Sequence, residues 1–104
     1  MIKVHIKYQD DKIHKIIMNG HSGYSESGSD IVCASASTIA ITSVDAILKF
    51  DEDAIFYKQD EGFLEITINH ASKEVKFILE NMIELLEELS SNYPKYIKIN
   101  KEVS

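Results

Sequence analysis

Hydrophobic and polar residues alternate along the start of the chain. Apolar residues occupy every second position from Ile2 to Tyr8, with polar residues between them. This is the pattern of a strand with one buried face. Residues 13–19 are apolar and β-branched enough for a second strand, and the polar residues 9–12 form a turn between the two. The segment therefore predicts a β-hairpin.

A similar pattern recurs in the second half of the chain. Residues 55–58 and 63–69 predict two more strands, and Asp60-Glu61-Gly62 supplies the turn that joins them. Residues 96–99 alternate again and predict a short final strand. The chain therefore carries two hairpins and one further strand.

A first helix is expected over residues 31–48. Asp30 is placed to cap it, because an aspartate can accept a hydrogen bond from a free amide of the first turn. Only Asp45 is charged within this segment, and many of its residues are small. A helix so poor in charge is expected to be buried on most sides and to approach its neighbours closely.

A second helix is expected after Ser72, which is placed as its cap, with Glu74 in the first turn, where the helix dipole favours a negative charge. Pro94, the sole proline, ends it. The apolar residues that recur at helical spacing are Val75, Ile78, Leu79, Met82, Leu85, Leu86 and Leu89.

The order of the expected elements defines a fold class. Two hairpins, each followed by a helix, give ββαββα with a possible short C-terminal strand. Adjacent hairpins favour an antiparallel or mixed sheet with helices packed on it, which is a two-layer α+β architecture. The 104 residues suit one domain, residues 1–104.

Several features bear on the compartment. We find no run of about 18 apolar residues of the kind that spans a membrane. The N-terminal residues alternate in polarity and lack the continuous apolar stretch of a signal peptide. The single cysteine cannot form an internal disulfide. We therefore expect a cytoplasmic protein without a membrane partner.

The charge of the chain narrows the class of partner. Its net charge is −6, with eleven lysines and no arginine. Arginine is the usual residue for contacts to phosphates and base edges, so a nucleic-acid groove is not expected. An acidic surface suits a basic partner. The simpler alternative is that the acidity only keeps the protein soluble.

The sole cysteine, Cys33, and His21 flank a loop rich in glycine and serine. With Asp30 as cap, Cys33 would be the third helical residue, where free amides and the helix dipole favour a reactive thiolate. The negative charge of Asp30 opposes this effect. His21 could take the thiol proton, which would make a Cys–His pair for acyl transfer. The loop glycines Gly23 and Gly28 would let the loop close over an extended peptide.

Other interpretations remain open from the residue types alone. A lone cysteine in an apolar helix is most often a small buried hydrophobe. Glycines before a helix can also hold an anion, but this loop lacks the Gly-Lys-Ser/Thr ending of a phosphate loop. One cysteine and scattered histidines match no zinc spacing. We interpret His5, His14 and His70 as surface or structural residues.

The pattern GH…GxDIVCA, from Gly20 to Ala34, with Ser37 one turn further on, resembles the ribosomal-processing cysteine protease family Prp, also called YsxB. The resemblance extends over nearly the whole chain, including the early hairpin and the Glu-rich second helix. It implies small cytosolic homodimers that remove a short N-terminal extension from a protein of the large ribosomal subunit. We expect neither a cofactor nor a metal.

The resemblance also implies roles for single residues. The family's nucleophile falls on Cys33 and its base on His21. Supporting or substrate-binding positions fall on Gly20, Gly23, Tyr24, Gly28, Asp30 and Ser37. Two segments differ from the sequence pattern common in the family, Ser22-Gly23-Tyr24 and Ala34-Ser35-Ala36. These differences affect the substrate contacts that the loop is expected to make. The alternative is a non-catalytic dimeric module that binds a basic peptide or assists ribosome assembly.

Overall fold

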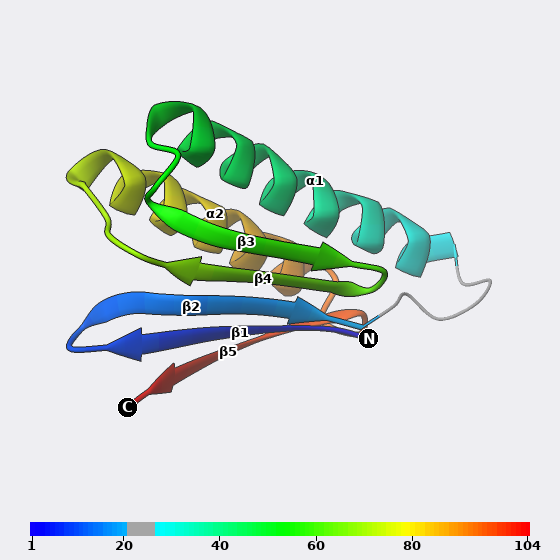
Figure 1. The fold of residues 1–104 in the computed structure, drawn as a ribbon. Helices are drawn as coiled ribbons and strands as arrows, with labels where there is room; N and C mark the ends of the chain where they lie inside the picture. The colour runs from blue at the N-terminus through cyan, green and yellow to red at the C-terminus, as the bar shows by residue number, and fades with distance from the viewer. Residues whose placement is uncertain (21–26) are drawn as a thin grey trace.

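The computed structural model describes residues 1–20 and 27–104. Seven elements follow one another along the chain, as Figure 1 shows. The predicted ββαββα order with a final strand is confirmed. The elements are β1 (Ile2–Gln9), β2 (Lys12–Asn19), α1 (Ser27–Phe50), β3 (Ile55–Asp60), β4 (Phe63–Ile68), α2 (Lys73–Asn92) and β5 (Ile97–Val103).

Two tight turns close the hairpins. Asp10 and Asp11 have φ angles of 53° and 63° between β1 and β2, and two successive positive φ angles suit the right-handed twist of a two-residue hairpin. Gly62, with φ of 68°, serves the turn between β3 and β4. The register of β1 with β2 shifts between Lys7, which lies opposite Lys15, and Tyr8, which lies opposite Ile13. The extra residue, His14, is on β2, as in a β-bulge of that strand.

The five strands form one mixed sheet in the order β3-β4-β2-β1-β5. Neighbouring strands are antiparallel except β1 and β5, which are parallel, with Ile2 opposite Ile97. The two hairpins are therefore joined through β2 and β4, and β1 is an inner strand. This order brings the β3–β4 turn next to the end of β2, where the candidate site lies.

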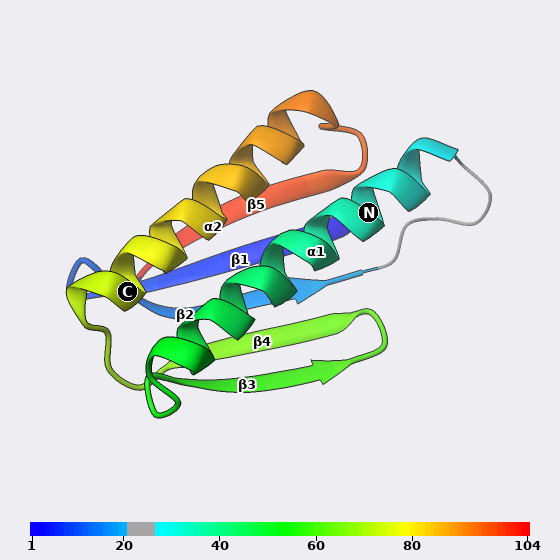
Figure 2. The same ribbon diagram turned by 90° about the horizontal axis from the view of Figure 1, so that it is seen from above.

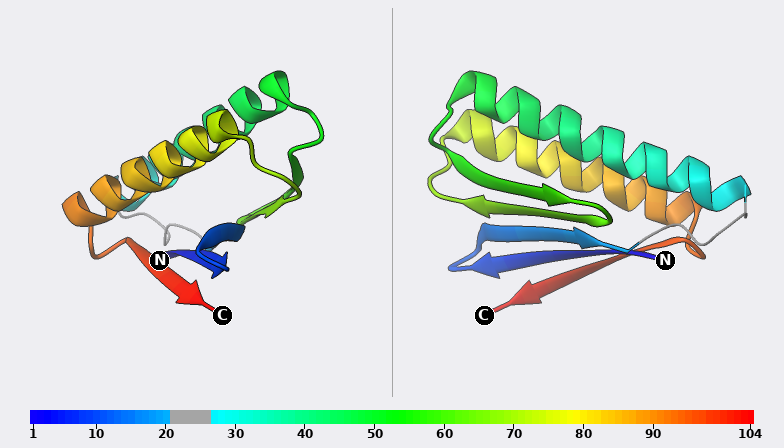
Figure 3. Two further views of the ribbon diagram at one scale, coloured as in Figure 1. Left: turned by 90° about the vertical axis from the view of Figure 1, so that its left-hand side faces the viewer. Right: turned by 45° about the vertical axis from the view of Figure 1, so that its right-hand side comes forward.

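Both helices cover the same face of the sheet. Figure 2 shows α1 and α2 side by side above the strands, and Figure 3 shows the two layers from the side. The core lies between these layers, and alternate strand residues meet one stripe of each helix there. Its largest fully buried side chains are Ile6, Ile16, Ile47, Ile66, Leu79, Met82, Leu86, Ile97, Val4, Val32 and Val75.

The second helix agrees with its sequence prediction. The Ser72 hydroxyl accepts a hydrogen bond from the amide of Val75 at 3.2 Å, and Glu74 lies in the first turn. The helix ends at Asn92, before Pro94. Val75, Leu79, Met82 and Leu86 of the predicted apolar stripe are buried, Ile78 and Leu89 are half-buried, and Leu85 is 40% exposed.

The start of the first helix was predicted wrongly. It begins at Ser27, so Asp30 is its fourth residue and not its cap, and Gly28 lies within the helix. The expectation that this helix is buried on most sides is also wrong for the single chain. Its outer side exposes apolar residues, with Ile31 56% and Phe50 54% exposed.

By length and composition alone, Ile31–Phe50 could cross a membrane, with a mean hydropathy of 1.8. The expectation that the chain holds no such segment was therefore wrong by this criterion. A third of the segment, 33%, is buried within the fold, and Val32, Ala36 and Ala40 belong to its core. Core helices of globular proteins pass the same test, and α1 is a core helix.

Candidate active site

Cys33 opens onto a cavity between α1 and the sheet. The cavity has a volume of about 210 Å³. Its walls come from segments far apart in the sequence, which the strand order brings together. They are Ile2 of β1, residues 18–20 at the end of β2, residues 59–64 around the β3–β4 turn, and Cys33, Ala36, Ser37, Ala40 and Ile41 of α1.

The thiol itself lies inside the helix and not at its start. Cys33 is the seventh residue of α1, is half-buried, and packs against the core. The free amides of this helix belong to residues 27–30, so the amide of Cys33 lies within the helical hydrogen-bond ladder. The prediction that helix-start amides surround Cys33 is therefore wrong by one turn.

Ser37 lines the same cavity, one turn after Cys33. The two residues share a helix face because they are four positions apart, and Ile41 continues that face by another turn. Ser37 is exposed, so its hydroxyl is not a buried polar group that must find a hydrogen-bond partner within the core. The predicted proximity of Ser37 to Cys33 matches this placement.

Gly20 forms the corner of the cavity at the end of β2. Its amide donates a hydrogen bond to the carbonyl of Gly62 at 3.0 Å, which ties it to the β3–β4 turn. Its φ of +110° is a conformation that residues with a Cβ rarely adopt, and a Cβ there would overlap the carbonyl oxygen of Met1. Position 20 therefore requires glycine, directly before His21.

Gly20→Ala is expected to lower the free energy of unfolding by roughly 2–4 kcal/mol, since backbone strain and overpacking act together. Urea unfolding followed by circular dichroism measures the loss. Gly28→Ala is the matched control, because residue 28 is helical and alanine favours a helix over glycine. An unfolding midpoint for Gly20→Ala equal to that of the wild type would contradict the close approach at Met1.

Part of the predicted site lies outside the described residues. This applies to His21, Gly23 and Tyr24, and to the predicted closing of the loop over a peptide. Gly28 and Asp30 fall in the first turn of α1. The structure therefore brings together Gly20, Cys33 and Ser37 among the predicted residues.

The histidines outside the motif agree with their interpretation as surface or structural. His70 lies 2.8 Å from Asp51, and this hydrogen bond, together with one from the amide of Asp53, holds the pKa of Asp51 below its usual value. His5 lies 3.4 Å from Glu102, and His14 is exposed.

Sequence reasoning missed one wall of the cavity. Residues 59–64 were assigned only to a hairpin, with no link to Cys33. A hairpin can be predicted because its two strands are neighbours in the sequence. The pairing of β4 with β2 joins strands that are distant in the sequence, and no signal in the sequence marked this pairing. Among the residues that the structure describes, no group of three or more His, Cys, Asp or Glu side chains could hold a metal ion.

A cysteine peptidase needs an accessible thiol near a base, and here the sole thiol lines an open cavity next to the strand end that precedes His21 in the sequence. Known proteins agree with this class. The family profile "Cysteine protease Prp" matches residues 1–98. The chain belongs to the ribosomal processing cysteine protease Prp family, and the resemblance seen in its sequence is confirmed.

Relatives match the chain over nearly its full length. The ribosomal processing cysteine protease Prp of Staphylococcus aureus is 34% identical, over 96% of this chain and 98% of the relative. The protein of the same name from Bacillus subtilis is 25% identical, over 99% of each. The chain is thus a cysteine protease of this family and spans the length of these relatives.

Solved structures show the same fold. A crystal structure of the S. aureus protease Prp with a substrate peptide has a TM-score of 0.88 at 30% identity, over 98% of this chain and 100% of the other. A second, with a covalently linked product peptide, has a TM-score of 0.87 at 32% identity, with the same shares covered. SMU.848 from Streptococcus mutans shares the fold with a TM-score of 0.89 at 22% identity, over 100% of this chain and 96% of the other.

Proposed function

We propose that the chain is a cytoplasmic endopeptidase that removes a short N-terminal extension from a protein of the large ribosomal subunit. Cys33 is its nucleophile and His21 its general base. The observation that carries the proposal is the placement of Cys33, the only thiol of the chain, on a cavity whose corner is the residue before His21. The S. aureus relative that carries a covalently linked product peptide supports the same chemistry.

The proposed reaction proceeds in two halves. His21 takes the proton of the Cys33 thiol, and the thiolate attacks the carbonyl carbon of the scissile peptide bond. The C–N bond breaks as His21 returns the proton to the leaving amine, which leaves a thioester on Cys33. His21 then deprotonates a water molecule, which attacks the thioester, releases the acid product and restores the thiol.

The developing oxyanion needs hydrogen-bond donors. The amide of Gly20 is already bonded to Gly62, and that of Cys33 lies within the helix. Asn19 is one of the residues that line the cavity, and its side-chain amide is a donor of the right type. We assign it as a candidate that the sequence did not single out.

The proposed substrate suits the charge of the protein. Proteins that pack against ribosomal RNA are basic because they neutralise phosphates, and the present chain carries a net charge of −6. Opposite charges raise the rate of encounter. A free thiol nucleophile also suits a reducing compartment, where thiols are kept reduced.

The test is mass spectrometry of the extended ribosomal protein after incubation with this chain. A single cut near its N-terminus, absent with Cys33→Ala, is expected. An intact substrate after prolonged incubation with the wild-type chain would overturn the proposed function, and cuts at many scattered sites would overturn the proposed specificity.

The protein is further proposed to act as a homodimer. The exposed apolar residues Ile31, Ile41 and Phe50 of α1, which are 56%, 43% and 54% exposed, are unusual for a helix with no partner on that side. Sedimentation equilibrium is expected to give twice the chain mass of 11.8 kDa at micromolar concentration. Ile31→Glu is expected to weaken the dimer, and a single 11.8 kDa species for the wild type would refute it.

A further inference from the structure

The cavity at Cys33 carries charge of only one sign among its described lining residues. Asp60 and Glu61 of the β3–β4 turn contribute two carboxylates, and no lysine, arginine or histidine accompanies them on the walls. The second cavity, of about 570 Å³ at the other end of the sheet, differs, because lysines and histidines line it beside its carboxylates. The candidate active site is therefore locally acidic within the described residues.

The turn that carries these carboxylates is held in place by hydrogen bonds. A carboxylate oxygen of Asp60 accepts a hydrogen bond from the amide of Glu61 at 2.7 Å. The carbonyl of Gly62 accepts one from Gly20 at 3.0 Å. Within the described residues neither Asp60 nor Glu61 takes part in an ion pair. Asp60 and Glu61 thus belong to a hydrogen-bonded turn on the wall of the cavity, and their exposed carboxylates are accessible to a bound cation.

We infer that the β3–β4 turn selects a basic residue of the substrate, whose lysine or arginine side chain is bound by Asp60 and Glu61 while the scissile bond lies at Cys33. The inference rests on the proposed role of Cys33. The cavity follows α1 from Cys33 to Ile41, which is about 12 Å at the rise of a helix. An extended peptide spans this length in about four residues, so the selected residue lies within about four positions of the scissile bond.

The expected effect is modest and depends on salt. Both carboxylates are exposed, and exposed ion pairs change an equilibrium or a rate by about two- to fivefold each. Salt screens such pairs, because the Debye length falls from about 10 Å at 0.1 M to about 3 Å at 1 M. Selection by this turn is therefore a preference among peptides and weakens at high ionic strength.

Charged thiol reagents test the local field without any cleavage. The Cys33 thiolate attacks the thiol sulfur of a methanethiosulfonate, forms a mixed disulfide and releases methanesulfinate. The measured quantity is the ratio of modification rates for the cationic trimethylammonium-ethyl reagent and the anionic sulfonatoethyl reagent. A change in the intrinsic reactivity of the thiol affects both rates equally, so it cancels in the ratio. Cys33 is the only cysteine of the chain and therefore the only thiol that these reagents can modify.

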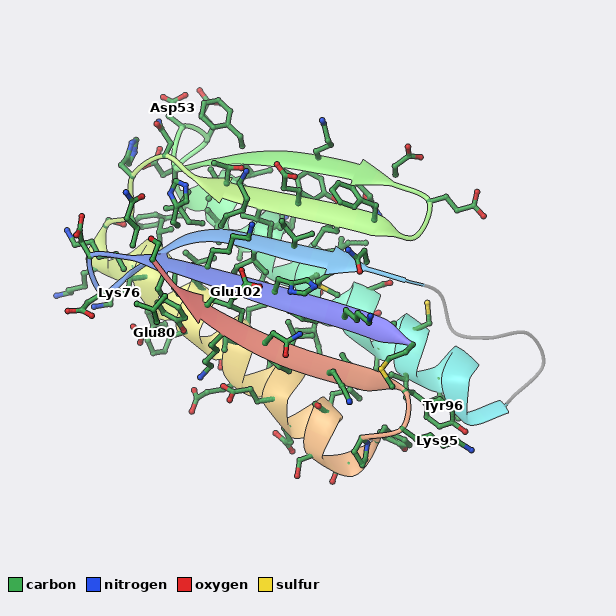
Figure 4. The ribbon with its side chains drawn as sticks, turned by 90° about the horizontal axis from the view of Figure 1, so that it is seen from below. Asp53, Lys76, Glu80, Lys95, Tyr96 and Glu102 are labelled. Carbon is green, nitrogen blue, oxygen red and sulfur yellow. The ribbon has the colours of Figure 1, made fainter. Side chains whose placement is uncertain are left out.

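The variant Asp60→Asn with Glu61→Gln is expected to lower this ratio about three- to tenfold. Asparagine keeps the carbonyl oxygen that accepts the Glu61 amide, so the turn is preserved. The matched control is Glu52→Gln with Asp53→Asn, which removes the same net charge. Asp53 lies at the other end of β3 from the turn, as Figure 4 shows. A ratio equal in the variant and the wild type would overturn the inference.

A lysine scan of the peptide then locates the selected residue. A single Lys→Gln change within four positions of the cut is expected to lower kcat/KM about two- to fivefold in the wild type at low salt. The same change is expected to have no effect in the Asp60→Asn, Glu61→Gln variant. Equal Lys/Gln ratios in both proteins would overturn the inference while the protease function stands. If the wild type cleaved no peptide, the proposed function would be overturned. The ratio of reagent rates would still show whether Asp60 and Glu61 create an acidic field at Cys33.

Discussion

Cys33→Ala and Cys33→Ser are expected to reduce peptide cleavage to the uncatalysed level while the fold stays intact. Alanine has no nucleophile, and a serine hydroxyl does not form the reactive anion that a thiol forms near neutral pH. Cleavage of the extended ribosomal protein, followed by mass spectrometry, measures the loss.

Stability provides the control for this prediction. Cys33 is half-buried, so its replacement is expected to change the free energy of unfolding by only about 1 kcal/mol. Urea unfolding of both variants checks that they remain folded at the assay temperature. Wild-type cleavage by a folded Cys33→Ala protein would end the assignment of Cys33 as nucleophile.

His21→Ala is expected to lower kcat/KM by about 10²–10⁴-fold, the usual contribution of a general base. It is also expected to slow alkylation of Cys33 by iodoacetamide at neutral pH. Rates measured from pH 5 to 9 cover the range in which an imidazole titrates. In the wild type the histidine's titration should appear in this profile, and in the variant it should be missing.

His14→Ala is the matched control for His21. His14 is exposed on β2, and the cavity that it lines is the one without Cys33. The same replacement there is expected to leave both cleavage and alkylation at wild-type rates. Superimposable alkylation profiles for His21→Ala and the wild type would show that His21 does not govern the thiol.

Local patterns in the sequence predicted most of the fold. Both hairpins, the final strand and the Ser72 cap of α2 follow from alternation, turn residues and capping, which depend on neighbours in the chain. The start of α1 did not follow, because Ser27 to Asp30 are residue types that favour turns and caps. The fold extends the helix back through them.

The site was predictable only where it is continuous in sequence. The motif from Gly20 to Ser37 singled out Gly20, Cys33 and Ser37, and the structure places all three on the wall of one cavity. The opposite wall, residues 59–64, depends on the pairing of β2 with β4, in which Asn19 lies opposite Phe63. The alternation within a hairpin does not specify which of its strands will pair with a strand of the other hairpin. The pairing of β2 with β4, and with it this wall of the cavity, could therefore be seen only in the structure.

The parallel pairing of β1 with β5 has a consequence for how the protein is made. Ile2 lies opposite Ile97 and donates its amide to the carbonyl of Tyr96 at 2.8 Å. Contacts between such distant residues form late, because a long loop must close before they contribute, whereas a hairpin closes in microseconds. A nascent chain therefore keeps one edge of β1 unpaired until β5 has been synthesised. Since Ile2 also lines the cavity at Cys33, this wall of the cavity is completed only once β5 has been synthesised and has paired with β1.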